Sequence, residues 1–223
     1  MNKTVLIVAA HADDEALGCG GTIARHVAEG DTVHAVFMAD GVSSRPNSAA
    51  DALERRMSAA KQAHEILGLQ RVAYLGLPDN RMDSLPLLDV VQALESVIQA
   101  ITPQVIYTHH HGDLNIDHRI THQAVMTACR PLPGSPVREI YAFEVLSSTE
   151  WATPQQEPFV PNVFVDISDF LDTKHKALQA YQLEMRFAPH SRSIEHAEYL
   201  ARHRGHSICV AAAEAFVAIR LIR

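Results

Sequence analysis

Two clusters of histidines and carboxylates stand out in the sequence, HADDE at residues 11–15 and HHHGDLNIDH at residues 109–118. His11 and Asp14 are three residues apart, so both side chains can point to one side where a strand gives way to a loop or a helix. Imidazoles and carboxylates bind divalent metal ions, and the charge of such an ion makes clustered acids tolerable. One further ligand would complete a three-ligand catalytic zinc site with a position open for water. The second cluster and the helix after it offer seven candidates: His109, His110, His111, Asp113, Asp117, His118 and His122.

The first cluster, taken alone, is equally typical of a metal site and of a solvated turn whose acid caps the following helix. A phosphate loop is a third interpretation, because Gly18, Gly20 and Gly21 follow a predicted buried strand. That loop requires G-x-G-x-x-G, or a lysine in G-x-x-x-x-G-K-[ST], and the sequence has neither. The acids would also repel a phosphate, so a nucleotide site is disfavoured. The glycines are expected instead to let the following helix pack close to the sheet and to leave room for substrate.

The segment DLNID, residues 113–117, also resembles the start of a calcium-binding EF-hand loop. Such a loop requires glycine at its sixth position and glutamate at its twelfth. The sequence places His118 and Ala124 at these positions, so calcium is disfavoured.

Strand-like and helix-like segments alternate through the first 130 residues, and both clusters directly follow predicted strands. Strands are predicted at residues 3–10, 32–39, 71–76 and 103–109. Helices are predicted at residues 20–30, 48–68, 85–101 and 117–129, the second with Ser48 as its cap and Gly68 as its stop. The alternation predicts an α/β fold with a doubly wound, mainly parallel sheet and helices on both faces. Ligands of such sheets bind at the carboxyl ends of the strands, where the two clusters could lie side by side.

The alternation weakens after residue 130, but no linker or repeat interrupts the sequence. Further strands are predicted at residues 138–146 and 162–168, and helices at 170–185 and 193–205. The segment AEAFVAIRLI, residues 213–222, fits a strand or a helix equally well. We therefore expect a single domain over residues 1–223.

Composition narrows the functional classes. The formal net charge is −7 and no long basic block occurs, so nucleic acid is not expected as a partner. No apolar stretch approaches the roughly 18–20 residues that span a bilayer. The N-terminal segment fits a first strand better than a signal peptide, which indicates a cytoplasmic protein. The three cysteines are far apart and form no C-x-x-C pair, so neither a disulfide framework nor a thiolate zinc site is indicated.

The two clusters also resemble the signatures of a known enzyme family. AHADDEALGCGG, residues 10–21, resembles the A-H-P-D-D-E signature of the PIG-L/LmbE-like zinc N-deacetylases, and NIDH, residues 115–118, resembles their H-x-D-H signature. The order and separation of the motifs match as well, and the likeness is strongest over residues 3–130. The resemblance implies a Rossmann-like fold and hydrolysis of an N-acetyl group from an amino sugar or sugar conjugate.

The resemblance also implies a role for each matching residue. His11, Asp14 and His118 would bind one Zn²⁺ per chain, although other divalent metals suit the same ligands. Asp13 would be the general base that takes a proton from water. Asp117 would brace a neighbouring histidine, as carboxylates behind metal ligands do.

Two residues depart from the family signatures. Ala12 replaces the proline of the first signature, which removes no ligand. Asn115 replaces the first histidine of H-x-D-H, to which the family assigns stabilisation of the oxyanion or protonation of the leaving group. The amide of Asn115 can donate a hydrogen bond but cannot supply a proton. We expect a replacement acid among His110, His111 and His190, and place His110 with Asn115 in the predicted catalytic set.

Three further residues near the predicted strand ends are candidates for substrate binding. Arg45 could reach a sugar hydroxyl or a phosphate, or lie on a surface loop. Arg56 matches a family arginine near substrate, although Ala59 replaces the acid that usually follows it. Asp79 could bind sugar hydroxyls or cap its turn.

The late loop APHSRS, residues 188–193, could also close over the site. His190 is the fourth candidate for substrate binding, with Arg192 beside it, and plain surface positions are the alternative for both. Trp151, the sole tryptophan, could stack on a sugar face, although packing is the commoner role of a single tryptophan.

The sequence thus favours a zinc-dependent N-deacetylase whose partner is a small N-acetyl amino sugar or glycoconjugate. Two alternatives remain open. One is a nucleotide-binding Rossmann-like protein without hydrolase activity, and the other is a metal-dependent amidase acting on a non-sugar amide. The sequence also leaves the oligomeric state open, including a homo-oligomer.

Overall fold

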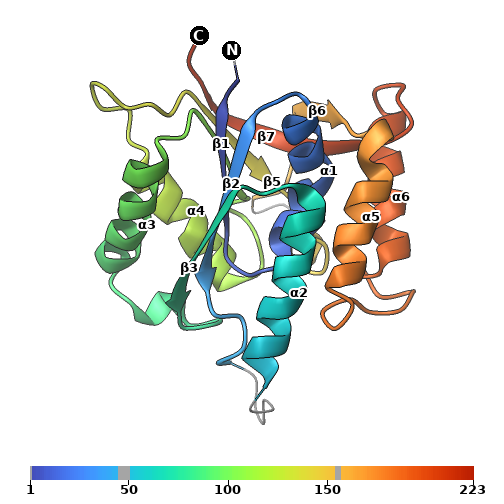
Figure 1. Ribbon diagram of the computed structural model, residues 1–223, viewed down its shortest axis with the longest axis horizontal. Coiled ribbons are helices and arrows are strands. Elements are labelled where there is room, and N and C mark those ends of the chain that lie inside the picture. Colours follow the sequence, from blue (N-terminus) through green and yellow to red (C-terminus); the bar gives the residue numbers. More distant parts are fainter. Residues whose placement is uncertain (1, 45–50, 154–156) are drawn as a thin grey trace.

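The computed structural model describes residues 2–44, 51–153 and 157–223, and a seven-stranded sheet forms its centre (Figure 1). The strands are β1 (Thr4–Ala9), β2 (Thr32–Ala39), β3 (Arg71–Leu77), β4 (Val105–His109), β5 (Glu139–Phe143), β6 (Val163–Asp166) and β7 (Ala213–Leu221). They lie in the order β3-β2-β1-β4-β5-β7-β6. β1 to β5 run parallel, whereas β7 is antiparallel to both of its neighbours.

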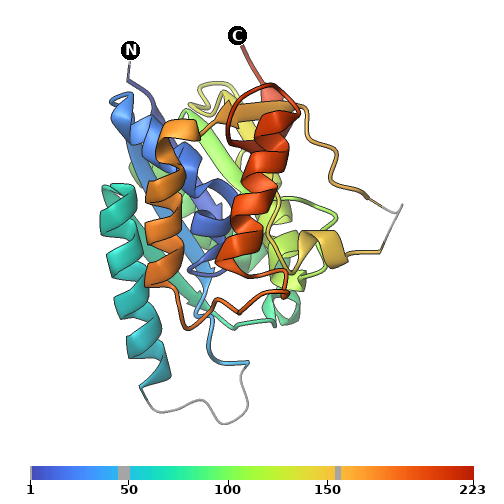
Figure 2. The same ribbon diagram turned by 90° about the vertical axis from the view of Figure 1, so that its right-hand side faces the viewer.

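Helices cover both faces of this sheet. They are α1 (Asp14–Ala28), α2 (Ala52–Leu67), α3 (Leu87–Ile101), α4 (Ile116–Ala128), α5 (Leu171–Ala180) and α6 (Ile194–His206). In Figure 1, α3 and α4 lie on one side of the sheet, and α1, α2, α5 and α6 lie on the other. Figure 2 shows α5 and α6 running side by side over the face that carries α1. Short 3₁₀ turns, η1 (Met82–Ser84), η2 (Thr149–Trp151) and η3 (Ser168–Phe170), complete the ordered elements.

The order of the strands confirms the expected α/β, Rossmann-like fold. The chain winds outward from β1 to β3, then returns to place β4 on the other side of β1. This reversal creates a crevice at the carboxyl ends of β1 and β4, where ligands of such sheets bind. His11 follows β1 and the start of α4 follows β4, so the two polar clusters meet at this crevice.

Each face of the sheet has its own apolar core. Val5 and Ile7 of β1 contribute to the core beneath α1 and α2, and Leu6 and Val8 contribute to the core beneath α3 and α4. All four side chains are fully buried. A strand covered on both faces has no polar side, which explains its continuous apolar sequence.

Helix α1 begins at Asp14, inside the acidic cluster, rather than at residue 20 as predicted. A kink at Cys19 divides it, with φ −148° and ψ 23° at that residue. The glycines on either side are needed for close packing, as expected. A Cβ atom on Gly21 would lie 2.7 Å from the side chain of Ile167, and one on Gly18 would overlap the ring of Phe143.

A buried ion pair satisfies the backbone groups that the kink leaves open. Lys174 Nζ donates to Leu17 O at 2.8 Å and lies 2.5 Å from Glu214 Oε1. Glu214 in turn accepts from the backbone N–H groups of Gly21 at 3.0 Å and Thr22 at 2.7 Å. Two residues from the last quarter of the chain therefore fix the helix that carries Asp14.

Two further sequence predictions concern the last segment of the chain and the cap of the second long helix. Residues 213–221 form strand β7, which settles the ambiguous segment, because antiparallel pairing with β5 and β6 gives it two neighbours. The predicted cap of the second long helix, Ser48, lies outside the described residues, and α2 is described from Ala52.

Candidate active site

The turn from β1 into α1 folds the acidic cluster inward. Asp14 Oδ2 accepts from the backbone N–H of His11 at 2.8 Å, and Asp13 N donates to Glu15 Oε2 at 2.9 Å. Asp13 has φ 138°, a conformation that non-glycine residues rarely adopt and that is found most often at functional sites. His11 is 7% exposed and the three acids are fully buried, which excludes the solvated turn.

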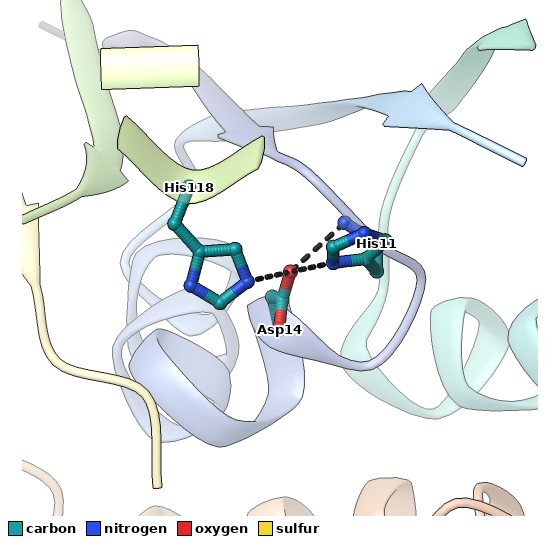
Figure 3. A group of neighbouring side chains, drawn as sticks. All are labelled: His11, Asp14 and His118. Carbon is teal, nitrogen blue, oxygen red and sulfur yellow. Dashed lines mark hydrogen bonds and ion pairs between the residues drawn. The ribbon is translucent and has the colours of Figure 1, made fainter. Parts of the chain in front are cut away.

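His11, Asp14 and His118 converge on one point (Figure 3). Asp14 Oδ2 lies 3.3 Å from His11 Nδ1 and 3.3 Å from His118 Nε2, so the carboxylate sits between the two imidazoles. One potential ligand atom from each residue lies within 4.8 Å of the others, and all three side chains are buried. This donor set could hold a divalent metal ion.

The electrostatics of this group fit a cation. Burial alone raises the pKa of Asp14, but the neighbouring histidines His118 and His11 hold it well below its usual range. Burial lowers the pKa of His118, and Asp14 and Asp113 outweigh that effect and raise it to about 9. In the described structure, Asp14 Oδ1 and His118 Nε2 are buried without a hydrogen-bond partner. Buried polar atoms without partners are costly, and coordination of a metal ion would satisfy them.

Asp113 orients His118. Its Oδ1 lies 3.1 Å from His118 Nδ1, and the carboxylate also accepts from Ser148 Oγ and, at 2.6 Å, from Thr149 Oγ1. A carboxylate that holds one ring nitrogen fixes the ring and leaves the other nitrogen for a metal. The sequence offered Asp113 only as a possible ligand, and its part in holding His118 was missed.

Asp117 and Asp79 lie against the other nitrogen of His11. His11 Nε2 is 3.2 Å from Asp117 Oδ2 and 3.1 Å from Asp79 Oδ1. Asp117 also accepts from the backbone N–H groups of Asn80 at 2.7 Å and Met82 at 3.0 Å. His11, Asp79 and Asp117 thus form a second group whose spacing would allow them to bind a metal ion, and this group shares His11 with the first. Since both carboxylates already accept several hydrogen bonds, they are better suited to orienting His11, whose Nδ1 faces the first group.

Asp13 lies beside the metal-binding group and is held by two arginines. Arg192 Nη1 donates to its Oδ2 at 2.8 Å, and Arg56 Nη2 lies 3.5 Å from its Oδ1. Burial raises the pKa of Asp13, while the charges of Arg192 and Arg56 act in the opposite direction. A carboxylate with a raised pKa is a stronger base, which suits proton transfer.

Arg56 is anchored by the C-terminal part of the chain. Its Nη1 pairs with Glu184 Oε1 at 2.9 Å, and its Nη2 donates to Ala12 O at 2.9 Å. Glu184 thus provides the carboxylate that Ala59 does not. Gly41, with φ 69°, leaves room for the guanidinium, because a Cβ atom there would lie 2.6 Å from Arg56 Nε.

These residues border a cavity of about 300 Å³. Its walls are mostly polar, and they come from loops at the carboxyl ends of the strands, from helices α2 and α4, and from the segments after β5 and α5. The lining residues are His11, Asp13, Gly41, Ser44, Arg56, Asp79, Asn80, Asn115, His118, Ser147, Ser148, Glu184 and Arg192.

Asn115 lines this cavity and also caps helix α4. Its Oδ1 accepts from Asp117 N at 2.8 Å, and its Nδ2 donates to Asn80 Oδ1 at 3.1 Å. Asparagine is among the best N-cap residues. The position therefore combines a structural role with an amide that faces the cavity.

The histidines expected to replace the family's acid lie elsewhere. His110 does not line the cavity; its ring packs against His111 and Phe159, and its Nε2 lies 2.9 Å from Glu157 O. His190 is exposed outside the cavity, where its Nδ1 accepts from Arg192 N at 3.0 Å. The expectations for His110 as an acid and His190 as a cavity residue are therefore not supported by their positions. Arg45 lies outside the described residues.

Side chains alternate in direction along a strand, which explains why His109 and His110 face different surroundings. His109, which the sequence offered as a possible metal ligand, stacks on His118 with ring centroids 3.9 Å apart. Its Nε2 accepts from Ala10 N at 2.8 Å. Burial and the neighbouring His118 lower its pKa well below the usual value, so His109 is a neutral packing partner of the site.

Comparison with known proteins establishes the family. The family model described as GlcNAc-PI de-N-acetylase matches residues 6–129, and the chain belongs to this PIG-L family. The uncharacterized deacetylase YaiS of Escherichia coli K12 is 32% identical over 186 residues, which cover 81% of this chain and 91% of that protein. The relatives also include an enzyme of a second class, 4-oxalmesaconate hydratase of Pseudomonas putida KT2440. It is 28% identical over 199 residues, which cover 79% of this chain and 72% of the hydratase.

A solved structure shares the fold. The N,N'-diacetylchitobiose deacetylase of Pyrococcus horikoshii superposes with a TM-score of 0.78 over 98% of this chain and 84% of that one, at 21% identity. Among the described residues, no helix is both long and apolar enough to cross a membrane.

Proposed function

We propose that this protein is a zinc-dependent hydrolase that removes an N-acetyl group from an amino sugar, or from a glycan or conjugate carrying one. The observation that carries the proposal is the convergence of His11, Asp14 and His118 beside Asp13 in a chain of the de-N-acetylase family. Two histidines and a carboxylate, with room for a water molecule, are a typical catalytic zinc site.

The proposed reaction assigns the base to Asp13. Zinc bound at the site would polarise the amide carbonyl and make water more acidic. Asp13 Oδ1 has no hydrogen-bond partner in the described part of the chain and can accept the proton, while Arg192 holds Oδ2. The water oxygen bonds to the carbonyl carbon, the C–N bond breaks, and the amine leaves with a proton, giving acetate and a free amino sugar.

The same carboxylate is proposed to return the proton. Of the described histidines, only His11 and His118 line the cavity, and both are assigned to the metal. Asn115 can donate a hydrogen bond to the substrate but no proton. Asp13 would therefore accept the proton from water and then donate it to the departing amine.

The balance of charge in the cavity favours an uncharged substrate over the carboxylate substrate of a hydratase. Among the described residues, the positively charged side chains that line the cavity are Arg56 and Arg192. Both face carboxylates: Arg56 pairs with Glu184, and Arg192 pairs with Asp13. A substrate such as oxalmesaconate would need further positive charge, whereas the hydroxyl groups of a sugar suit the polar walls.

Metal analysis and product assays test the proposal together. The purified protein should contain about one zinc per chain and should release acetate from N-acetylglucosamine or N,N'-diacetylchitobiose. 4-Oxalmesaconate and simple non-sugar acetamides serve as comparison substrates. Hydration of 4-oxalmesaconate without acetate release would make the protein a hydratase, and acetate release only from non-sugar acetamides would make it a different amidase. Tight nucleotide binding by a metal-free protein would support the nucleotide-binding alternative.

A further inference from the structure

The cavity accommodates only a small part of any large substrate. Its volume of about 300 Å³ is at the lower end of the range of about 300–1,000 Å³ that is usual for small-molecule sites. One sugar ring is suited to such a space. Any group attached to that ring must leave the cavity and cross its rim.

An aromatic pair is joined to residues that line the cavity: Trp151 N donates to Ser148 O at 3.2 Å, and His190 accepts from Arg192 N. Trp151 is 51% exposed, although tryptophan usually buries most of its surface. Its ring meets that of His190 edge to face, with centroids 5.6 Å apart and an interplanar angle of 69°. Trp151 ends the turn η2, which begins with Thr149, and Thr149 donates to Asp113. The indole is therefore linked through this turn to the carboxylate that holds His118.

Two contacts join the loops that carry this pair, and a third fixes His190 within its own loop. Arg192 Nε donates to Ser147 Oγ at 3.0 Å, and Arg192 N donates to His190 Nδ1 at 3.0 Å. The hydroxyl of Ser191 donates to Glu150. These contacts hold the rings in place before any ligand arrives, which reduces the entropy lost on binding.

We propose that Trp151 and His190 form a second sugar subsite, which stacks the ring attached to the N-acetylated sugar of the substrate. The subsite rests on the proposed function, because the first ring must occupy the cavity. The half-exposed indole offers an apolar surface for the C–H groups of a sugar ring. His190 Nδ1 accepts a hydrogen bond, so the neutral ring carries its proton on Nε2, which can donate to a sugar hydroxyl.

Tryptophan fluorescence reads this subsite directly, because Trp151 is the only tryptophan among the 223 residues. N,N'-Diacetylchitobiose added to Asp13→Asn protein loaded with zinc should change the emission with saturation, and N-acetylglucosamine should cause a much smaller change. The measurement does not require turnover. Equal responses to the two sugars, or no response to the disaccharide, would overturn the subsite.

Kinetics separate binding from loop packing. Trp151→Ala should raise KM for the disaccharide about 10-fold, with little effect on KM for the monosaccharide, and Trp151→Phe should restore most of the loss. Tyr199→Ala, which removes another exposed aromatic ring on α6, is the control. If Trp151→Ala lowers the melting temperature and affects both substrates equally, Trp151 only packs the loops and the proposal is wrong. Absence of acetate release from every sugar would refute the proposed function, while the fluorescence titration would still decide the subsite.

Discussion

The region up to α4 and the region from β5 onward contribute to the cavity in different ways. The first supplies His11, Asp13 and Asp14 from the end of β1, and His118 from the first turn of α4 after β4. Its side chains are positioned by parallel strands that lie next to each other in the sheet. The family model matches residues 6–129, which lie within this region.

The second region supplies side chains from loops. Ser147 and Ser148 follow β5, and Glu184 and Arg192 lie between α5 and α6. Side-chain hydrogen bonds hold these loops, such as those from Ser148 to Asp113 and from Arg192 to Ser147. On the proposed function, the first region would supply the metal ligands and the base, whereas the second would orient the base and shape the space for substrate.

The largest expected effect comes from removing a metal ligand of the first region. His118→Ala should reduce bound zinc from about one per chain to a trace and abolish acetate release, because two ligands hold the ion poorly. Zinc is measured by elemental analysis of the purified protein. His206→Ala, an exposed histidine of α6, is the matched control and should retain both zinc and activity. Full zinc content in the His118→Ala protein would remove this residue from the ligand set.

The next largest effect should follow from the loss of the base without loss of the metal. Asp13→Asn keeps the shape of the side chain but cannot accept the proton, so kcat should fall by about 10²–10⁴-fold. Zinc content should stay at about one per chain. Turnover at the wild-type rate in a zinc-loaded Asp13→Asn protein would rule out Asp13 as the base.

The Lys174–Glu214 pair tests how firmly the second region supports the first. Lys174→Met leaves the buried carboxylate of Glu214 without its partner, and removal of one member of a buried pair costs about 3–5 kcal/mol of unfolding free energy. Denaturant unfolding measures the loss. The double variant Lys174→Met/Glu214→Leu removes the unpaired charge and should recover part of the stability. Unchanged stability in Lys174→Met would mean that the pair does not fix α1.

Arg192 tests whether the second region adjusts the base. Arg192→Gln should lower kcat by about 10-fold or more, because Asp13 loses the partner that orients its Oδ2, and Arg192→Lys should restore part of this loss. Steady-state kinetics on one sugar substrate separate kcat from KM. A rise in KM alone, or equal defects in the Gln and Lys variants, would argue against an effect on Asp13.

The smallest expected effects come from substituting two helix caps, one from each region. Asn115 caps α4, and Ser193 caps α6 by accepting from His196 N at 3.0 Å. Asn115→Ala and Ser193→Ala should each cost about 1 kcal/mol of unfolding free energy. Only Asn115→Ala should also lower kcat/KM, because only Asn115 lines the cavity. Equal activity in both variants would limit Asn115 to its role as a cap.

The sequence by itself determined the backbone of the site. The apolar run before His11 encodes a strand buried on both faces, and the alternation of strands and helices predicts a parallel sheet with its ligands at the carboxyl ends of the strands. The sequence therefore placed both clusters at an edge where they could meet, and the strand order, with β1 beside β4, brought them together. The glycines of α1 likewise indicated close packing from the sequence alone, although only the fold shows that they pack on Phe143 and Ile167.

Only the tertiary structure decided which distant groups complete the site. Arg192 meets Asp13 across 179 residues of sequence, and Glu184 takes the place of the acid absent at Ala59. Loop positions depend on packing and on side-chain hydrogen bonds from other elements, which no local pattern encodes. The same limit applies to the run of three histidines. The sequence offers all three as possible ligands and puts His110 forward as the acid, but His109, the last residue of β4, stacks on His118, and His110, just beyond the strand, packs against Phe159 outside the cavity.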